Sequence, residues 1–310
     1  MKLRLVSLVT VVAACLASQG AYAQISAYNH QLPARTIGMA GNGRSFASGA
    51  NALFLNPAAL GVAHQYIFGA GYGYAGAGDG AHVLSAEWID STPNLFNMAM
   101  GFAFDYVPYS GEDAAGNKLD DSYNAHLSMS YTAKMQNTEL HVGVGGHRLI
   151  NIQGTDADIW TGDAGLVLNF GNQFMAGFAG YNLYRDGDAE FPRGIGGGVS
   201  YWSGPFMGGF AVTANFDLTF APHEGEEAEE EPQLRYLGPL QYMPVQDILT
   251  RGAANYDAMV ENTRVAAGVT IIAASNVGLE FGYQHNLDDS SDMVVVVNLQ
   301  VYNPFPGGAM

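Results

Sequence analysis

The sequence is poor in charged residues and almost free of cysteine. Charged side chains make up 13% of its 310 residues, compared with about 25% in typical soluble domains. Only 12 lysines and arginines accompany 29 aspartates and glutamates, so the net charge is −17. A nucleic-acid-binding function, which needs a basic face, is therefore disfavoured. Cys15 is the single cysteine, so a disulfide framework is not expected.

Long apolar runs are also lacking. No stretch of about 18 or more apolar residues follows the N-terminal region, which disfavours a helical membrane protein. Apolar residues nevertheless make up 48% of the chain, aromatic residues 12%, and there are 40 glycines. This apolar content is sufficient to build a core, so a disordered chain is disfavoured. The composition favours a single β domain rich in glycine and aromatic residues.

Residues 1–23 have the anatomy of a secretory signal peptide. A basic start precedes the short apolar stretch 5–16, and residues 21–23 read Ala-Tyr-Ala, which fits the small-x-small rule for cleavage. We therefore expect the mature chain to begin after this segment and to lack Cys15. The alternative is that residues 12–15 form a lipoprotein cleavage box, in which case Cys15 would carry a lipid.

From residue 65 onward, large apolar side chains alternate with small or polar ones. Between residues 96 and 106, every second residue is Phe, Met or Tyr, and the residues between them are Asn, Ala, Gly or Asp. Because successive side chains of a strand point to opposite faces, each such segment predicts a strand with one apolar face. About twelve segments approach the 9–11 residues that a tilted strand needs to cross a bilayer. The predicted strands are 65–75, 81–89, 95–107, 122–135, 138–149, 160–170, 173–184, 193–202, 206–220, 262–273, 276–286 and 292–302.

The connections between these segments alternate between short and long. Outer-membrane barrels have tight periplasmic turns and longer outer loops, and the alternation fits this rule if the first strand runs outward. In lipid a sheet has to close on itself, because open edges would leave backbone groups unsatisfied. The pattern predicts an all-β fold: a multi-pass transmembrane antiparallel β-barrel of about twelve strands, possibly fourteen, in the Gram-negative outer membrane. The barrel spans 65–303, and 304–310 form a C-terminal extension.

The polar faces and the aromatic residues support this prediction over a soluble β-sandwich. A water-facing surface would carry more Lys and Glu, whereas the alternating polar positions are mostly Gly, Ala, Ser, Thr and Asn. Aromatic side chains gather near the segment ends, as they do in membrane-interface girdles. These aromatic residues are Tyr66, Tyr74, Trp88, Tyr106, Tyr109, Tyr123, Trp160, Tyr184, Tyr201, Trp202 and Tyr302.

Residues 24–64 do not alternate. A glycine-rich stretch leads into a short apolar helix at about 47–55, which Pro57 ends. Two phrases carry a family resemblance: residues 38–41 read Gly-Met-Ala-Gly, and residues 52–58 read Ala-Leu-Phe-Leu-Asn-Pro-Ala. They resemble the start of the long-chain fatty acid transporter superfamily of outer-membrane barrels, the FadL/TodX type, which includes PorV-like secretion barrels.

The resemblance implies an N-terminal hatch within the barrel lumen and the uptake of apolar ligands. Family transporters bind such ligands at an outer hydrophobic site and pass them through the barrel wall. The family transporters have fourteen strands and a longer chain, so the sequence departs from them in length. The hatch residues implied by the resemblance are Asn56, Pro57, Ala58, Gly38, Gly41, Arg35 and Arg44.

Several ionisable residues within the predicted strands fall on the face opposite the large apolar side chains. Because ionisable groups do not face lipid without a large cost, we expect them to line the lumen. They either brace the barrel and the hatch as internal ion pairs, with Arg35 and Arg44 as partners, or form a polar track for a solute. These residues are Asp105, His126, His141, Asp163, Asp217, Arg264 and Glu280.

The segment 221–261 is expected to be a long acidic outer loop. Its glutamates at 224–231 form a run that is typical of a solvated surface, and no ligand spacing supports a metal site there. The apolar stretch that follows either covers the barrel mouth as a ligand patch or packs against neighbouring loops and lipopolysaccharide. The patch residues are Leu234, Tyr236, Leu237, Leu240, Tyr242 and Met243.

The sequence therefore favours a channel for the passive uptake of hydrophobic small molecules, such as fatty acids or aromatic hydrocarbons. No cofactor, metal or enzymatic activity is expected, because no Ser/His/Asp arrangement or G-x-S-x-G elbow meets the requirements of an active site. The expected partners are outer-membrane lipid and a hydrophobic ligand. The alternative is a structural or secretion-associated barrel that binds a partner protein and transports nothing itself.

Overall fold

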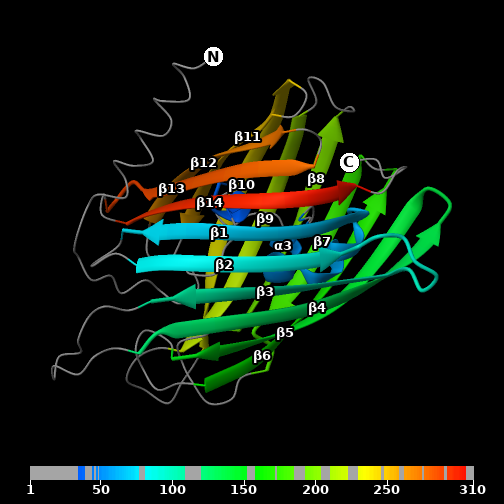
Figure 1. The fold of residues 1–310 in the computed structure, drawn as a ribbon. Helices are drawn as coiled ribbons and strands as arrows, with labels where there is room; N and C mark the ends of the chain where they lie inside the picture. The colour runs from blue at the N-terminus through cyan, green and yellow to red at the C-terminus, as the bar shows by residue number, and fades with distance from the viewer. Residues whose placement is uncertain are drawn as a thin grey trace.

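The computed structural model places fourteen strands in one closed antiparallel barrel, with short N-terminal helices in its lumen (Figure 1). The structure describes residues 34–38, 44, 47, 49–76, 81–108, 120–151, 158–171, 173–184, 193–203, 210–222, 230–245, 248–257, 262–273, 276–289 and 292–304. The helices are α2 (Ala34–Ile37), α3 (Ala50–Leu55) and the 3₁₀ helix η2 (Pro57–Gly61). Among the described residues, no helix has the length and apolar character to span a bilayer.

The strands pair with their neighbours in sequence, and β1 closes the barrel against β14, where Gln65 lies opposite Pro304. The strands are β1 (Gln65–Ala75), β2 (Ala81–Asp90), β3 (Met98–Val107), β4 (Ser122–Met135), β5 (Thr138–Ile150), β6 (Asp158–Phe170), β7 (Phe174–Tyr181), β8 (Arg193–Ser203), β9 (Phe210–Pro222), β10 (Glu230–Val245), β11 (Ile248–Asp257), β12 (Asn262–Ala273), β13 (Val277–Asn286) and β14 (Met293–Pro304). We call the end of the barrel with the tight 136–137 turn between β4 and β5 the turn end, and the opposite end the loop end.

The alternation read from the sequence sorts side chains between the lipid face and the lumen. On β3, Met98, Met100 and Phe102 are 44%, 41% and 41% exposed, whereas Ala99 and Ala103 are 5% and 1% exposed. Large apolar residues therefore face lipid, and the small residues between them face the interior. The fold class and the outer-membrane barrel predicted from the alternation are confirmed.

The barrel has fourteen strands, the alternative to the expected twelve, because two further strands lie within the segment expected to be a long outer loop. Residues 221–261 contain β10 and β11, which form ladders with β9 and β12 as well as with each other. The three prolines of β10, at 232, 239 and 244, cannot donate ladder hydrogen bonds, and such residues usually argue against a strand. The two extra strands keep the number even, so both ends of the β1–β14 strand series lie at the turn end.

Aromatic side chains on the outer face gather near the ends of the strands. Tyr66 and Trp88 pack edge to face at the turn end, with ring centroids 6.2 Å apart. At the loop end, Tyr106 and Tyr123 lie 5.3 Å apart. Tyr302 differs from the prediction: it shares the lumen face of β14 with Gln300 and packs against the hatch. Val301, the residue before it, faces lipid and is 48% exposed.

Candidate functional site

Within the hatch, the conformation of α3 and η2 follows from three residues. Gly49 precedes α3 with φ of 62°, a left-handed conformation that glycine adopts without strain. Asn56 separates the two helices, and its Oδ1 accepts a hydrogen bond of 3.1 Å from the backbone N–H of Ala58. Pro57 occupies the first turn of η2, where a missing N–H costs nothing. The Asn-Pro-Ala phrase is thus a helix cap.

Two glycines of the wall make room for this phrase. Gly143 of β5 lies directly opposite Gly165 of β6 in the ladder. A Cβ atom at 143 would lie 2.2 Å from the backbone N of Ala58, and one at 165 would lie 1.9 Å from Oδ1 of Asn56. Because real Cβ contacts are never this short, only glycine at both positions allows η2 to reach the wall. The wall and the hatch therefore fit together through absent side chains.

The hatch meets the wall closely at two further glycines. Gly38, at the end of α2, contacts Gly268 of β12, and a Cβ at 38 would lie 2.8 Å from the Cα of Gly268. On β3, five strands away from β12 around the barrel, a Cβ at Gly101 would lie 2.8 Å from Cδ2 of Leu53. These contacts place the hatch against widely separated strands at once.

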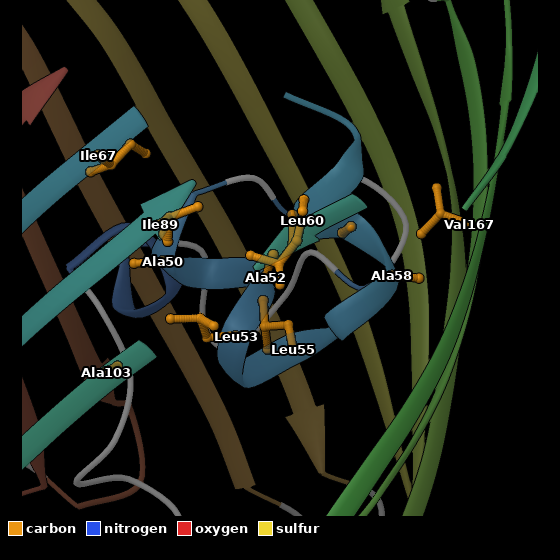
Figure 2. Packing of buried hydrophobic residues seen from close by; sticks show 13 residues of the cluster. Ala50, Ala52, Leu53, Leu55, Ala58, Leu60, Ile67, Ile89, Ala103 and Val167 are labelled. Carbon is orange, nitrogen blue, oxygen red and sulfur yellow. The ribbon is translucent and has the colours of Figure 1, made fainter. Parts of the chain in front are cut away.

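An apolar cluster holds α3 and η2 against strands β1, β2, β3 and β6 (Figure 2). Leu53 and Leu60 of the hatch are 0% and 1% exposed, and they pack with Ile67 and Ile89 of the wall. Figure 2 shows these side chains converging on the short helices from several strands. Burial of this kind contributes about 25 cal/mol per Å² of apolar surface, so the cluster is a substantial part of what retains the hatch.

Arg44 of the hatch is 2% exposed. Its Nη1 donates a 2.6 Å hydrogen bond to the carbonyl oxygen of Leu55, and its guanidinium lies 4.4 Å from the ring centroid of Tyr181 on β7. The backbone carbonyl of Arg44 also accepts a 2.7 Å hydrogen bond from Nδ2 of Asn56. Arg35 lies on α2, and Gly41 is outside the described residues.

A polar cluster lies above α3, in the half of the lumen nearer the loop end. The ring of His126 packs 4.4 Å from that of Phe54 in the hatch and 4.6 Å from that of His147 on β5. Nδ2 of Asn124 lies 2.5 Å from Nε2 of His126 and 3.3 Å from a carboxylate oxygen of Asp105. His126 thus connects the hatch to the buried acid of β3 and to the histidine of β5.

The same cluster extends to the end of β7. Nδ1 of His147 lies 3.3 Å from Oδ2 of Asp163, and its Nε2 lies 3.0 Å from Oδ1 of Asn182. The second carboxylate oxygen of Asp163 accepts a 2.8 Å hydrogen bond from the backbone N–H of Asn182. Asn182 is buried with φ of 53°, so these contacts draw the chain inward directly after β7.

A second polar network lines the lumen across β2, β1 and β14. Glu87 of β2 lies opposite Gly69 of β1, which in turn lies opposite Gln300 of β14. Because Gly69 has no side chain, Oε1 of Glu87 passes over it and accepts hydrogen bonds of 2.6 Å from Gln300 and 3.0 Å from Asn298. This network joins strands on both sides of the barrel seam.

Glu280 belongs to the adjoining group on β11, β12 and β13. Its Oε1 accepts a 3.0 Å hydrogen bond from Thr270 and lies 3.7 Å from Nη2 of Arg251, which also donates 2.6 Å to Thr270. The side chains of Arg251 and Glu280 are 1% and 3% exposed, so the ion pair is shielded from water. A buried pair of this kind is costly to break from one side.

The remaining lumen candidates lie at other positions of the wall. His141 is buried, with Nδ1 2.8 Å from Oγ1 of Thr132, and both contact the space beside Gly61 of the hatch. Arg264 lies near the loop end and pairs with Asp292 at 2.9 Å. Asp217 lies on β9, opposite Arg235 of β10 in the ladder. The predicted lumen residues are therefore distributed over several sites.

The proposed outer-loop patch is not a loop. Its residues Leu234, Tyr236, Leu237, Leu240, Tyr242 and Met243 all lie on β10, a strand that pairs with both β9 and β11. The sequence suggested a lid because its prolines interrupt the alternation. A backbone that is paired on both sides belongs to the barrel wall and cannot fold over the mouth.

Several residues of the site were not predicted from the sequence. Glu87 occupies an alternating position of a predicted strand, so the parity of that strand would have identified it. Arg251 was missed because β11 was taken for part of a loop. Gly143 and Gly165 carry no sequence signal of their own, since glycine occurs on both faces of these strands.

Comparison with known proteins identifies the fold but no sequence relative. No protein-family model matches the chain, and no curated protein sequence matches it significantly. The toluene transporter TodX of Pseudomonas putida superposes with a TM-score of 0.59 at 10% identity, covering 88% of this chain and 97% of TodX. The toluene transporter TbuX of Ralstonia pickettii gives 0.58 at 13% identity, covering 89% and 98%.

The outer membrane protein Omp33 of Acinetobacter baumannii also matches, with a TM-score of 0.50 at 8% identity, covering 78% of this chain and 99% of Omp33. These likenesses span nearly the full length of each solved barrel. Together with the hatch fitted into the lumen, they confirm at the level of fold the resemblance that the hatch residues suggested. The chain shares the fold of the toluene transporters TodX and TbuX, and in this chain that fold is a fourteen-stranded barrel with short N-terminal helices in its lumen.

Proposed function

We propose that this barrel is an outer-membrane channel for the passive uptake of hydrophobic small molecules, either fatty-acid-like compounds or aromatic hydrocarbons. The observation that carries the proposal is an apolar cluster on one side of the lumen, near its loop end. Barrels that pass polar solutes have a polar interior instead. Ile37 of α2 packs against this cluster from β1, β2, β3 and β14. The cluster consists of Ala75, Ala81, Val107, Val294 and Val296, with Val83 beside it.

This cluster suits a hydrophobic solute for the same reason that it holds Ile37. Ile37 is 1% exposed, and the wall residues that pack with it in this cluster are all alanine or valine. A solute that enters from the loop end gains the same burial of apolar surface as the isoleucine that it displaces. Similar solved barrels carry the names of toluene transporters, which is consistent with this class of solute.

Because the hatch lies in the lumen, a solute cannot pass straight along the barrel axis. The solute therefore needs an exit through the barrel wall. Among the described strands, β7 is the shortest, and its ladder with β6 covers only Ala164–Phe170. Beyond that ladder, the backbone N–H groups of Asn182 and Leu183 bond to Oδ1 of Asp163 and to the carbonyl oxygen of Gly162. The loop-end residues 158–161 of β6 extend past these contacts. We propose that solutes leave the lumen beside this short strand, above the hatch, and so reach the membrane without crossing the periplasmic turn end.

The proposal is tested by uptake in whole cells. A strain that lacks the protein is complemented with the wild type or with Val294→Ser/Val296→Ser, and the uptake of radiolabelled toluene and oleate is measured below saturation. Removing two valine contacts, each worth about 1 kcal/mol, should lower uptake of the favoured solute by about tenfold or more. Val295→Ser, on the outward face of the same strand, is the matched control.

The result that would refute the proposal is equal uptake by the null strain and the complemented strain for both solutes. Stoichiometric recovery of a partner protein with the detergent-extracted barrel, combined with unchanged uptake, would favour a secretion-associated role instead. Unequal uptake of toluene and oleate would assign the solute class.

A further inference from the structure

The connection between β2 and β3, residues 91–97, exposes two large apolar side chains at the turn end. Leu95 is 98% exposed and Phe96 is 74% exposed. We call residues 91–97 the β2–β3 turn. In Figure 1 this turn is cyan and extends at the right-hand end of the barrel beside the β4–β5 hairpin. In water, two adjacent side chains this exposed would be unfavourable, so their surroundings need an explanation.

The turn is built to hold these side chains outward. Oδ1 of Asn94 accepts hydrogen bonds from the backbone N–H groups of Phe96 and Met98, at 3.0 and 3.2 Å. Nδ2 of Asn94 donates to the carbonyl oxygens of Thr92 and Met98, at 3.2 and 2.5 Å. A single amide side chain thus satisfies four backbone groups around the tip. Because these hydrogen bonds fix the backbone of the turn, the side chains of Leu95 and Phe96 are held in their exposed positions.

The start of the turn is attached to the barrel rim. The backbone N–H of Ser91 donates a 2.9 Å hydrogen bond to the carbonyl oxygen of Gln65, and Oγ of Ser91 accepts 3.1 Å from the N–H of Gln65. Oγ of Ser91 also donates to the carbonyl oxygen of Ala63. These hydrogen bonds fix the start of the turn to the segment that joins the hatch to β1.

The exposed tip continues the surface that faces lipid. Met98 and Met100 follow it on the outward face of β3, and Tyr131, opposite Met98 on β4, is 51% exposed. The carbonyl oxygen of Asn97 accepts 2.9 Å from the backbone N–H of Thr132, so the turn lies directly beside β4. Phe96, Met98 and Met100 therefore form an exposed apolar row from β3 to the tip, with the exposed Asn97 beside it.

The aromatic girdle gives the level of this surface. Tyr66 and Trp88 pack together on the outward face at the turn end, where aromatic rings mark the boundary between acyl chains and headgroups. We propose that the β2–β3 turn is an anchor that inserts Leu95 and Phe96 into the periplasmic leaflet of the outer membrane, at the boundary between headgroups and acyl chains. In this arrangement the tip of the turn contacts phospholipid and is not exposed to the water of the periplasm.

The experiment measures depth in the membrane at single positions. The chain with Cys15→Ser carries one introduced cysteine, either Phe96→Cys or Asn137→Cys at the tip of the neighbouring β4–β5 hairpin, and is labelled with a nitroxide. The protein is reconstituted into vesicles of phosphatidylethanolamine and phosphatidylglycerol. Collision rates with oxygen, which concentrates in lipid, and with a water-soluble nickel chelate are then compared.

The label at 96 should favour oxygen over nickel several-fold more than the label at 137, since Asn137 is exposed and polar. Nickel access at 96 equal to that at 137 would overturn the proposal and place the turn in water, as a periplasmic docking site would require. Leu95→Cys repeats the measurement independently if the label at 96 disturbs folding. The outcome does not depend on which solute the channel takes up.

Discussion

Replacing Gly143 with alanine should detach the hatch from the wall without touching the barrel ladder. The added Cβ would lie 2.2 Å from the backbone N of Ala58 and 2.4 Å from the backbone C of Pro57. Both atoms belong to the main chain of η2, so neither can move away by a change of rotamer. Relief of the clash therefore requires η2 itself to shift from β5.

The size of the effect follows from the cost of overpacking. Inserting a methyl group into a well-packed core costs about 1–3 kcal/mol. Since about 1.4 kcal/mol corresponds to a tenfold change in an equilibrium constant, the population with an unpacked hatch should rise about 5- to 150-fold. The ladder between β5 and β6 is retained, because the backbone at 143 keeps an ordinary strand conformation.

Trypsin cleavage after Arg44 reports this population. The Arg44 side chain is buried in the packed hatch, where it is held by the carbonyl of Leu55, so cleavage requires unpacking. Cleavage rates are measured on protein in vesicles, with the new N-terminus at Ser45 identified by mass spectrometry. Gly146→Ala is the control, because its Cβ would meet nothing nearer than 3.6 Å. Equal cleavage rates for the two alanine variants would refute the fit of glycine to hatch.

Three further changes test other parts of the structure. Arg251→Met should destabilise the barrel to urea by about 3–5 kcal/mol, because it strands the buried Glu280, and a second change of Glu280→Gln should recover most of the loss. Val144→Arg on the lipid face should cost about 2–4 kcal/mol in the folding of the barrel into vesicles, whereas Asn137→Arg at a turn should leave the folding free energy nearly unchanged. Asn56→Ala should raise the trypsin cleavage rate of the hatch, since the lost hydrogen bonds are worth about 1–3 kcal/mol; a wild-type rate would contradict the role of the cap.

The barrel was predictable because its environment writes a strict pattern into the sequence. One face of every strand meets lipid and the other meets a crowded lumen, so large apolar and small residues must alternate. All twelve predicted segments correspond to strands of the structure. β10 and β11 escaped prediction because prolines and acidic residues interrupt the pattern in one and small residues blur it in the other.

The site was less predictable, because its contacts join residues that are remote in sequence. Parity placed His126 and Asp163 in the lumen, but no pattern indicated that His147 lies between them. Gly143 and Gly165 define positions where the hatch contacts the wall. Because glycine has no side chain, the sequence gives no sign of which strand glycines make such contacts. Tyr302 shows the converse error, because an aromatic residue near a strand end fits either a girdle or a packed lumen.

Glu87 has a consequence for how the barrel closes. It sits in one row with Gly69 and Gln300, across the seam where the first and last strands meet. A slip of one residue between β1 and β14 would turn Gln300 and Asn298 toward lipid and leave the buried carboxylate without amide donors. Only the observed register between β1 and β14 places the amide groups of Asn298 and Gln300 where they donate hydrogen bonds to the carboxylate of Glu87. Glu87 of β2 thus favours the correct alignment of β1 with β14, although it belongs to neither of these two strands.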